Sequence, residues 1–296
     1  EFNGSFLHFF PTVAVILNID EDHLDYYKDL DDIENAFRRF ASLVPEDGWV
    51  VGCGDEKRVR SVLESVQCRT RTYGLEPQNE VRAEDISYDE NGCALFTATL
   101  YGHPLTDVEL QVPGEHNVKN ALAVIAVASL FSLPMSLVAE TLHEFRGVHR
   151  RYELTSVTDG VRVYQDYGHN PTETRNVLHV ARIQAPQKLW AVLQPHTYSR
   201  TKALFDGFLT CFDEADEVLV TDICGAREVD PGDINSGMLV DAMVKKGIHA
   251  HLTPSFDDAE AYLRAHWQPG DVVVTLGCGD IDLLNEQIAR NGDTHK

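Results

Sequence analysis

The second half of the chain alternates short apolar runs with longer amphipathic segments. The strand candidates, most of them apolar, lie at 161–166, 188–193, 217–221, 249–252 and 271–276. Segments with helical spacing lie between and after them, at 172–185, 202–211, 236–246, 256–266 and 281–289. This alternation predicts a mostly parallel sheet with helices on both faces.

The first half has a less regular pattern. Residues 11–19 (PTVAVILNI) and 49–51 are predicted to be strands, and 94–100 with 105–112 to form a hairpin. Helices are predicted around Ile33–Phe40, where Asp31 and Glu34 resemble a capping box, and at 56–66, from about 115 to 130, and at 135–142. Because the regular alternation begins only near Arg151, we place a domain boundary near Gly147, between residues 1–146 and 147–296.

Polar clusters follow the predicted strands of the second half. The four clusters are Asp166–Pro171, Gln194–Arg200, Thr221-Asp222 and Gly277–Asp280. The first contains the functional side chains of Asp166, Tyr167 and His169, and the second contains those of His196 and Arg200. Ligands of open parallel sheets bind beyond the carboxyl ends of the strands. Pro171 at the first helical position explains where the following helix starts. It does not explain why a carboxylate, a phenol and an imidazole stand directly before it. An arginine at a strand end suits a small carboxylate.

The Gly277–Asp280 cluster has a structural interpretation. Its GxG is weak as a dinucleotide fingerprint, because Asp282 stands at the position of the third glycine and the cluster follows the last strand rather than the first. We therefore interpret it as a tight turn.

Three further clusters each allow two interpretations. Asp20–Asp25, with His23 inside it, is either a cation site or a solvated acidic turn. Gly114–Asn120 is either a helix start capped by Asn117 or a site where amides recognise a nucleotide base. Phe145–Arg151 is either a surface hinge or an arginine site for phosphate.

Composition narrows the function classes. The 296 residues suffice for two domains, and the net charge of −22 argues against a nucleic-acid or anionic-membrane binder. The sequence has neither an apolar run of membrane-spanning length nor a recognisable signal peptide. The six scattered cysteines are interpreted as free thiols of a cytoplasmic protein, mostly buried as small apolar residues. Because Glu1 rather than Met leads into an apolar segment, we expect a fragment of a longer protein.

These motifs, in their order along the chain, resemble the Mur ligase family. They are EFNGSFLHFFP at 1–11, NIDEDHLDYY at 18–27, PGEHNVKNALA at 113–123, FRGVHRRYE at 145–153, DYGHNPTE at 166–173 and QPHTYSRT at 194–201. The resemblance implies an α/β chain in which residues 1–146 are a truncated central, ATP-binding domain of the P-loop ATPase type with a mixed sheet. Residues 147–296 would be the Rossmann-like, amino-acid-binding domain. The family's N-terminal UDP-binding domain and its GxxxxGK[ST] phosphate loop have no counterpart in this sequence.

The resemblance also implies an activity, that of an ATP-dependent amide ligase. The segments at 166–173 and 194–201 look like the branch that joins L-alanine to UDP-N-acetylmuramate through an acyl phosphate, in peptidoglycan precursor synthesis. Two alternatives stay open: a recycling ligase that accepts a tripeptide instead of alanine, and a non-catalytic nucleotide-binding protein. The fragment by itself is expected to be inactive, because it lacks the phosphate loop and the UDP site.

Individual roles carried over from the family are expectations for this sequence. Glu1 and His23 would contribute to a Mg²⁺ site, and His116, Asn117 and Asn120 would line the adenine pocket. Arg151 would contact the ATP phosphates on domain closure, and Asp166 would hold the ribose or adjacent nucleotide atoms. The amino-acid and acyl-phosphate site would be shaped by Tyr167, His169, His196 and Arg200, of which Arg200 is expected to bind the alanine carboxylate.

Overall fold

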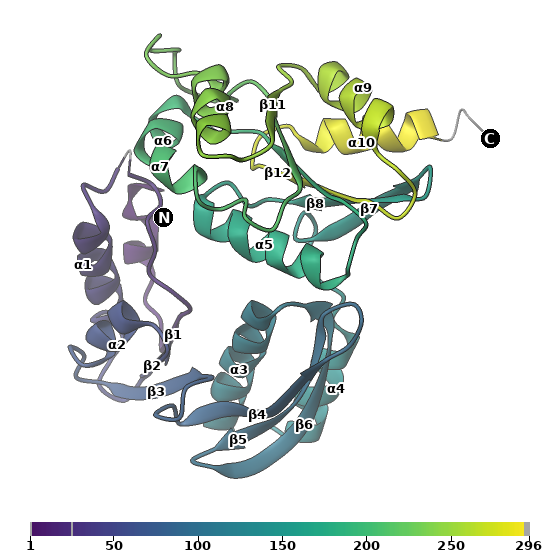
Figure 1. The fold of residues 1–296 in the computed structure, drawn as a ribbon. Coiled ribbons are helices and arrows are strands. Elements are labelled where there is room, and N and C mark those ends of the chain that lie inside the picture. Colours follow the sequence, from purple (N-terminus) through teal and green to yellow (C-terminus); the bar gives the residue numbers. More distant parts are fainter. Residues whose placement is uncertain (1, 25, 293–296) are drawn as a thin grey trace. The chain divides into compact units, whose positions relative to one another are not determined.

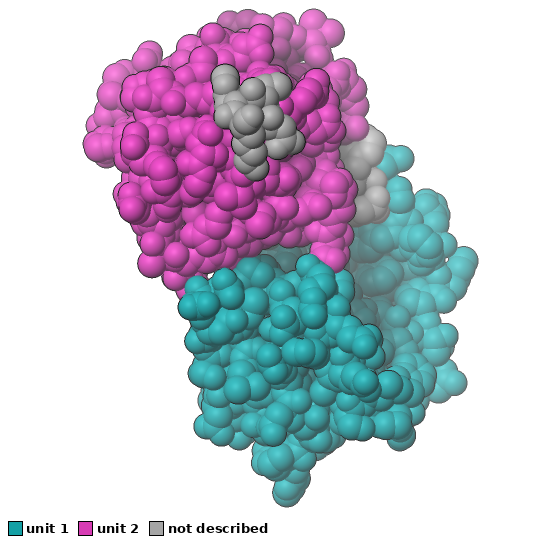
Figure 2. Space-filling model, turned by 90° about the vertical axis from the view of Figure 1, so that its right-hand side faces the viewer, with its two compact units in different colours: residues 1–146 teal, residues 147–296 magenta. Residues whose placement is uncertain are grey.

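The chain has an α/β fold, as predicted. The computed structural model describes residues 2–24 and 26–292. Its contacts separate the chain into two units, residues 1–146 and residues 147–296 (Figure 2). Within the described residues, each unit has its own six-stranded sheet (Figure 1). None of the helices in the described part of the chain combines the length and the apolar character that a membrane span needs.

The sheet of unit 1 is mixed, as the resemblance implied. Its order is β1 (Val13–Ile16), β2 (Trp49–Cys53), β3 (Arg69–Gly74), β4 (Val81–Tyr88), β5 (Cys93–Leu100) and β6 (His103–Pro113). Strands β1 to β4 pair in parallel, whereas β4, β5 and β6 pair antiparallel. Strands β3 and β4 were not predicted, because both mix charged and hydroxyl side chains with their apolar residues and neither shows a continuous apolar run.

The helices of unit 1 lie where the sequence placed them. They are α1 (Leu30–Ala41), α2 (Lys57–Leu63), α3 (Glu115–Leu130) and α4 (Met135–Glu144), preceded by the 3-10 segment η1 (Phe2–His8). The predicted capping box of α1 is wrong. Asp29 is the N-cap and accepts a hydrogen bond from the Asp32 backbone N–H, while Glu34 pairs with Arg38 and Arg58 instead.

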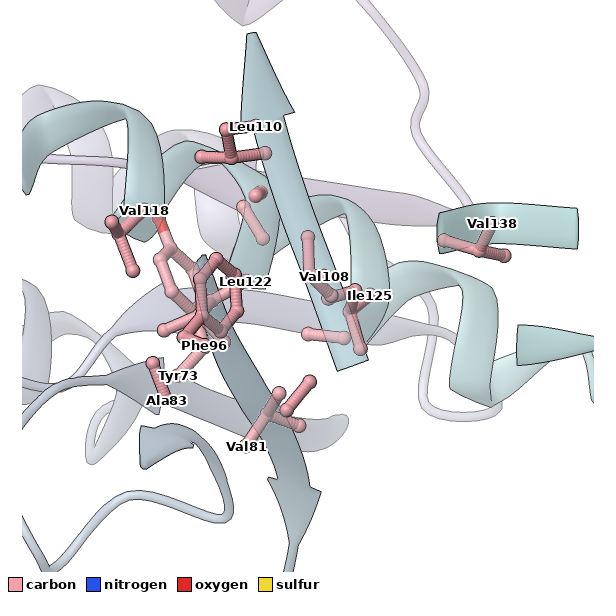
Figure 3. Packing of buried hydrophobic residues seen from close by; sticks show 14 of the residues in the cluster. Tyr73, Val81, Ala83, Phe96, Val108, Leu110, Val118, Leu122, Ile125 and Val138 are labelled. Carbon is pink, nitrogen blue, oxygen red and sulfur yellow. The ribbon is translucent and has the colours of Figure 1, made fainter. Parts of the chain in front are cut away.

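The core of unit 1 forms where α3 lies against the sheet. Leu122 and Ile125 of α3 are fully buried and belong to one apolar cluster with Phe96 and Val108 of the hairpin strands (Figure 3). Close packing of this kind fixes the start of α3 relative to the end of β6. The first turn of α3 therefore presents its polar side chains from a rigid support.

The sheet of unit 2 is parallel except at one edge. Its order is β11 (Ala250–Leu252), β10 (Glu217–Val220), β9 (Leu189–Leu193), β12 (Val272–Leu276), β8 (Val161–Asp166) and β7 (Glu153–Thr158). The five predicted strands are confirmed. The antiparallel edge strand β7 was not predicted, because its apolar residues Leu154 and Val157 face solvent and give it no buried run.

Helices cover both faces of the unit 2 sheet. They are α5 (Pro171–Ile183), α6 (Tyr198–Ala203), α7 (Phe205–Phe208), α8 (Ser236–Lys245), α9 (Phe256–His266) and α10 (Asp282–Gly292). Leu263 of α9 and Leu284 of α10 pack with Trp190 and Val163 of the sheet, whereas α5 lies on the opposite face (Figure 1). The single helix predicted at 202–211 is two short ones, which meet at Leu204.

Candidate functional site

Four neighbouring strands of unit 2 end at the same edge of the sheet. The register pairs Leu276 of β12 with Asp166 of β8 on one side and with Leu193 of β9 on the other, and Leu193 pairs with Val220 of β10. The loops that follow these strands are therefore neighbours. They bring together the predicted clusters that begin at Asp166, Gln194, Thr221 and Gly277.

Asp166 organises the loop that follows β8. Only 4% of this residue is exposed, and its two carboxylate oxygens accept hydrogen bonds from the backbone N–H groups of Gly168 at 2.6 Å and Tyr152 at 2.8 Å. Burial raises the pKa of the Asp166 carboxyl, although both hydrogen bonds oppose the shift. The side chain is thus committed to shaping the loop, and the contact with ribose stays a prediction.

The arginines beside Tyr167 have different environments. Arg150 is largely buried and donates to the carbonyl oxygens of Gly277 at 3.2 Å and Gly279 at 2.9 Å, so it holds the turn after β12. The side chain of Arg151 is 50% exposed and lies 3.9 Å from a carboxylate oxygen of Glu173. Both guanidinium groups stack near the Tyr167 ring. Of the two, Arg151 has the exposed head that a phosphate ligand needs.

His169 is held between the loop and the start of α5. Its backbone N–H donates to Glu173 Oε2 at 2.9 Å, and its Nδ1 lies 3.1 Å from the carbonyl oxygen of Tyr167. Helix α5 begins with Asn170 as N-cap, which accepts from the Glu173 N–H, and with Pro171 at the first helical position, as predicted. The contacts of Nδ1 with Tyr167 and Glu173 hold the His169 ring, whose side chain is only 10% exposed.

Arg200 and His196 contact each other on the loop and short helix after β9. Thr197 caps α6, and Arg200 Nη1 donates to His196 Nδ1 at 3.2 Å. Arginine is always a donor, so Nδ1 of His196 must be the acceptor and the neutral ring carries its proton on Nε2. Both side chains are half-buried. Both residues lie beyond the carboxyl end of β9, as the sequence indicated, and the anion site itself stays a prediction.

Cys278 lies near His169 and His196, and sequence reasoning missed this proximity. The thiol is half-buried, and both imidazole rings are near enough to affect its pKa. Burial raises the pKa of the Cys278 thiol, but the two imidazoles outweigh burial and bring this pKa down to about 6. The turn was interpreted as purely structural. The turn follows β12, which lies between β8 and β9 in the sheet, and this position could have indicated that the cysteine belongs to the candidate site.

The three predicted adenine residues form one cluster at the start of α3 in unit 1. Asn117 Nδ2 donates to the Pro113 carbonyl at 2.8 Å and lies 3.2 Å from His116 Nε2, while Asn120 Nδ2 donates to Asn117 Oδ1 at 3.2 Å. The interpretation of Asn117 as helix cap is wrong, because Gly114 occupies the N-cap position. His116 and Asn120 are exposed, so they offer a ring and an amide to a ligand.

A cavity of about 680 Å³ lies beside this cluster in unit 1. Its lining is apolar except for Asn120 and Thr141, and it includes Val15 of β1, Val124 of α3 and Leu137 of α4. His116 and Asn117 are not part of the lining. The cavity and the polar cluster thus share only Asn120.

The predicted cation site lies only partly within the described residues. Glu1 lies outside them. His23 follows Asp22, whose carboxylate accepts the His23 backbone N–H at 2.7 Å and lies 3.7 Å from Nε2. Among residues 2–24 and 26–292, no group of three or more His, Cys, Asp or Glu side chains is arranged to hold a metal. Asp22 nevertheless supplies a partly exposed carboxylate, which fits Mg²⁺ because this ion takes one or two carboxylates together with water and phosphate oxygens.

Comparisons with known proteins agree with this architecture. A chain 43% identical over 286 residues is the UDP-N-acetylmuramate–L-alanine ligase of Clostridium botulinum (strain Okra), and the match covers 97% of this chain and 62% of that one. The crystal structure of the UDP-N-acetylmuramate-alanine ligase of Thermotoga maritima has a TM-score of 0.78 at 26% identity and covers 99% and 62% of the two chains. MurF ligase of Thermotoga maritima in complex with ADP has a TM-score of 0.74 at 16% identity, over 97% and 63%.

The matched regions define what this chain contains. It spans about three fifths of the length of these relatives. Residues 5–128 match the family described as Mur ligase middle domain, and residues 150–279 match the one described as Mur ligase, glutamate ligase domain. This chain therefore belongs to the Mur ligase family and carries a middle and a C-terminal domain of that family.

Proposed function

We propose that this chain supplies the ATP-binding and amino-acid-binding parts of a longer ligase that joins L-alanine to UDP-N-acetylmuramate. The observation that carries the proposal is the placement of Arg200, which lies beside His196 at the carboxyl ends of parallel strands, where small ligands of this fold bind. The similarity to alanine ligases over 97% of the chain supports the same assignment. The proposed reaction belongs to peptidoglycan precursor synthesis, and its nucleotide substrates favour a cytoplasmic protein.

The proposed reaction has two steps. The lactyl carboxylate attacks the γ-phosphorus of ATP, so that a carboxylate oxygen is joined to phosphorus and ADP leaves. The amine of L-alanine then attacks the acyl phosphate, and the tetrahedral intermediate collapses to an amide, releasing phosphate and one proton. Both steps depend on holding the reactants in position and on balancing the charge of the phosphates.

The described residues would serve these steps in different ways. Arg200 binds the alanine carboxylate with its guanidinium fork and leaves the amine to react. His196 accepts a hydrogen bond from Arg200 and thereby orients it. Tyr167 and His169 line the same edge of the sheet, and Arg151 offers a partly exposed cation to phosphate.

The start of α3 would hold the adenine base. Asn117 aligns Asn120 through the 3.2 Å hydrogen bond, and the exposed amide of Asn120 suits the donor and acceptor edge of a purine. His116 lies against Asn117 and offers a flat ring for the base to stack on. In unit 2, Asp166 supports the amino-acid site indirectly, by fixing the loop that carries Tyr167 and His169.

Magnesium would bind near His23, with Asp22 as its carboxylate ligand. A bound Mg²⁺ ion would neutralise the negative charge of the phosphates while that charge moves between the reacting oxygens. The proposed contribution of Glu1 belongs to the same site.

An isotope experiment tests the proposed reaction. UDP-N-acetylmuramate with ¹⁸O in both oxygens of the lactyl carboxylate is incubated with ATP, Mg²⁺, L-alanine and the longer protein that contains this chain. We expect one ¹⁸O atom in the released phosphate, because the carboxylate oxygen that attacks phosphorus leaves with it. Phosphate without label would contradict an acyl-phosphate path. The 296-residue chain alone, which has no GxxxxGK[ST] segment, is expected to release no ADP in an alanine-dependent manner.

A further inference from the structure

Thr197, which stands between His196 and the first turn of α6, has an unusual backbone conformation. Its φ is 62° and its ψ is 141°. Of the non-glycine residues with positive φ in the described part of the chain, it is the only one with a branched β-carbon. Such a side chain crowds the neighbouring carbonyl oxygens, and glycine alone adopts this conformation without strain. Strain of this kind persists only where the surrounding structure imposes it.

Hydrogen bonds fix the backbone on both sides of Thr197. On its N-terminal side, the Thr197 N–H donates to the Cys224 carbonyl at 2.8 Å, and the Cys224 N–H donates to the Pro195 carbonyl at 2.9 Å. His196 thereby forms a parallel bridge with Cys224, which lies in the loop after β10. On its C-terminal side, the Thr197 carbonyl accepts from the N–H of Thr201 at 3.1 Å and from its Oγ1 at 2.7 Å. Rotation of Thr197 to a negative φ would therefore break either the bridge or the first turn of α6.

The strained residue sets the geometry of two side chains of the candidate site. His196 belongs to the bridge and Arg200 to α6, so the φ and ψ of Thr197 decide how one faces the other. In the observed conformation, Arg200 Nη1 lies 3.2 Å from His196 Nδ1. We propose that Thr197 is a positioning residue of the amino-acid site, whose strained backbone holds Arg200 against His196. The inference rests on the proposed function, which assigns the alanine carboxylate to Arg200.

The side chain of Thr197 gives a reason for threonine at a position that glycine would occupy without strain. Its Oγ1 accepts a hydrogen bond from the Arg200 N–H at 3.4 Å, so it caps α6 at the residue that is to be positioned. The residue is only 8% exposed. Glycine would relieve the strain, but it would remove the cap and let the backbone sample other values of φ and ψ. We therefore expect a glycine variant to be relaxed but less precisely ordered.

The first test measures the strain. Thr197→Gly and Thr197→Ala in the 296-residue chain are unfolded in urea and monitored by hydrogen exchange in peptides of unit 2. Both variants lose the hydroxyl cap, but only glycine fits a φ of 62° without strain. The glycine variant is therefore expected to unfold at the higher urea concentration.

A second cap residue supplies the matched control for this comparison. Glycine is better than alanine even at an unstrained N-cap, so the effect of the cap must be subtracted. Ser255 caps α9 in the same unit with a φ of −104°. We expect the difference in urea midpoint between the glycine and alanine variants to be about twofold larger at Thr197 than at Ser255, because only Thr197 adds the strain of positive φ.

The second test measures the positioning, by ¹⁵N NMR of the His196 ring in the 296-residue chain. While Arg200 donates to Nδ1, the proton of the neutral ring is on Nε2. Thr197→Gly should populate both tautomers, because the guanidinium is no longer held against the ring. Thr197→Ser, which keeps the hydroxyl group, should retain the Nε2–H tautomer. Ser255→Gly should leave the His196 signals unchanged.

Kinetics of the longer ligase add a third readout. In Thr197→Gly, the KM for L-alanine should rise about tenfold, while kcat and the KM for ATP stay within about twofold. A merely structural role of Thr197 would lower the amount of active enzyme and leave the KM for L-alanine unchanged. If the unsubstituted ligase did not use L-alanine, the proposed function would fail, whereas the unfolding and NMR tests on the 296-residue chain would still decide whether Thr197 is strained and holds Arg200.

Two results would overturn the proposal. One is an equal difference between the glycine and alanine variants at Thr197 and Ser255, which would show that the backbone is not strained. The other is a Thr197→Gly chain in which His196 keeps its single tautomer, which would show that the strain does not position Arg200. A glycine variant that failed to fold would also contradict the proposal, because glycine fits the observed φ and ψ.

Discussion

Substitution of Arg200 by alanine in the longer ligase is expected to lower kcat/KM for L-alanine by about 10²–10³-fold, because the substrate carboxylate loses a charge-assisted partner worth about 3–4 kcal/mol. Arg200 follows β9 at the strand ends with its guanidinium donating to His196, a position that fits the proposed contact with the alanine carboxylate. Steady-state ADP release at varied L-alanine concentration measures this effect. The KM for ATP should change little, since the proposed contact is with the amino acid.

Lys202 provides a matched control for Arg200. It lies on the same short helix, but its side chain is 62% exposed and pairs with Asp233 on the surface. Lys202→Ala should therefore leave kcat/KM for L-alanine within about twofold, as is usual for an exposed ion pair. Equal losses in the two variants, or an Arg200→Ala enzyme with ordinary kcat/KM, would show that Arg200 does not bind the amino acid.

Asp166→Ala is expected to lower the free energy of unfolding of unit 2 by about 2–4 kcal/mol, because two buried backbone donors lose their acceptor. These donors are the N–H groups of Gly168 and Tyr152. Urea denaturation, monitored by hydrogen exchange in peptides that cover residues 150–170, measures the unfolding free energy of unit 2 directly. Asp222→Ala is the control, because Asp222 follows β10 at the same edge of the sheet but is exposed.

The cost of removing Asp166 should also depend on pH. Burial raises the pKa of this carboxyl in the folded chain, so the folded state binds the proton more tightly than the unfolded state does. The carboxyl therefore contributes most to stability at low pH, and this contribution is lost as pH rises through the raised pKa. The difference in unfolding free energy between the unsubstituted chain and Asp166→Ala should be larger at pH 4 than at pH 7. A difference that grows toward pH 7 would contradict the assigned shift.

The parallel sheet of unit 2 could be predicted because its inner strands β9, β10 and β12 are mostly apolar. Since parallel strands end at one edge, the placement of Asp166, His196 and Arg200 at the same edge also followed from the pattern. Strands β3, β4 and β7 could not be predicted in this way. Strand β3 is composed mainly of polar residues although it is half-buried, and β7 leaves its apolar residue Leu154 half-exposed. Neither strand therefore shows the run of apolar residues that indicates a buried strand.

Contacts between distant parts of the sequence limited the prediction of the site. Arg150 donates a hydrogen bond to a turn that lies 127 residues further along the chain, and two histidines from other loops lower the pKa of the Cys278 thiol. No local pattern around Cys278 distinguishes a thiol near imidazoles from a cysteine buried as a small apolar residue. The same limit affected Asp166, where the sequence suggested a ligand contact and the fold uses both oxygens for backbone donors.

The most direct test of the ligase assignment is ADP release by the longer protein in the presence of UDP-N-acetylmuramate, ATP, Mg²⁺ and one amino component at a time. We expect ADP to form in proportion to the amide product with L-alanine, and to fall to background when either L-alanine or UDP-N-acetylmuramate is omitted. Efficient turnover of a tripeptide in place of L-alanine would instead identify a recycling ligase. Absence of turnover with every amino component would contradict the account and favour a protein that binds nucleotide without catalysis.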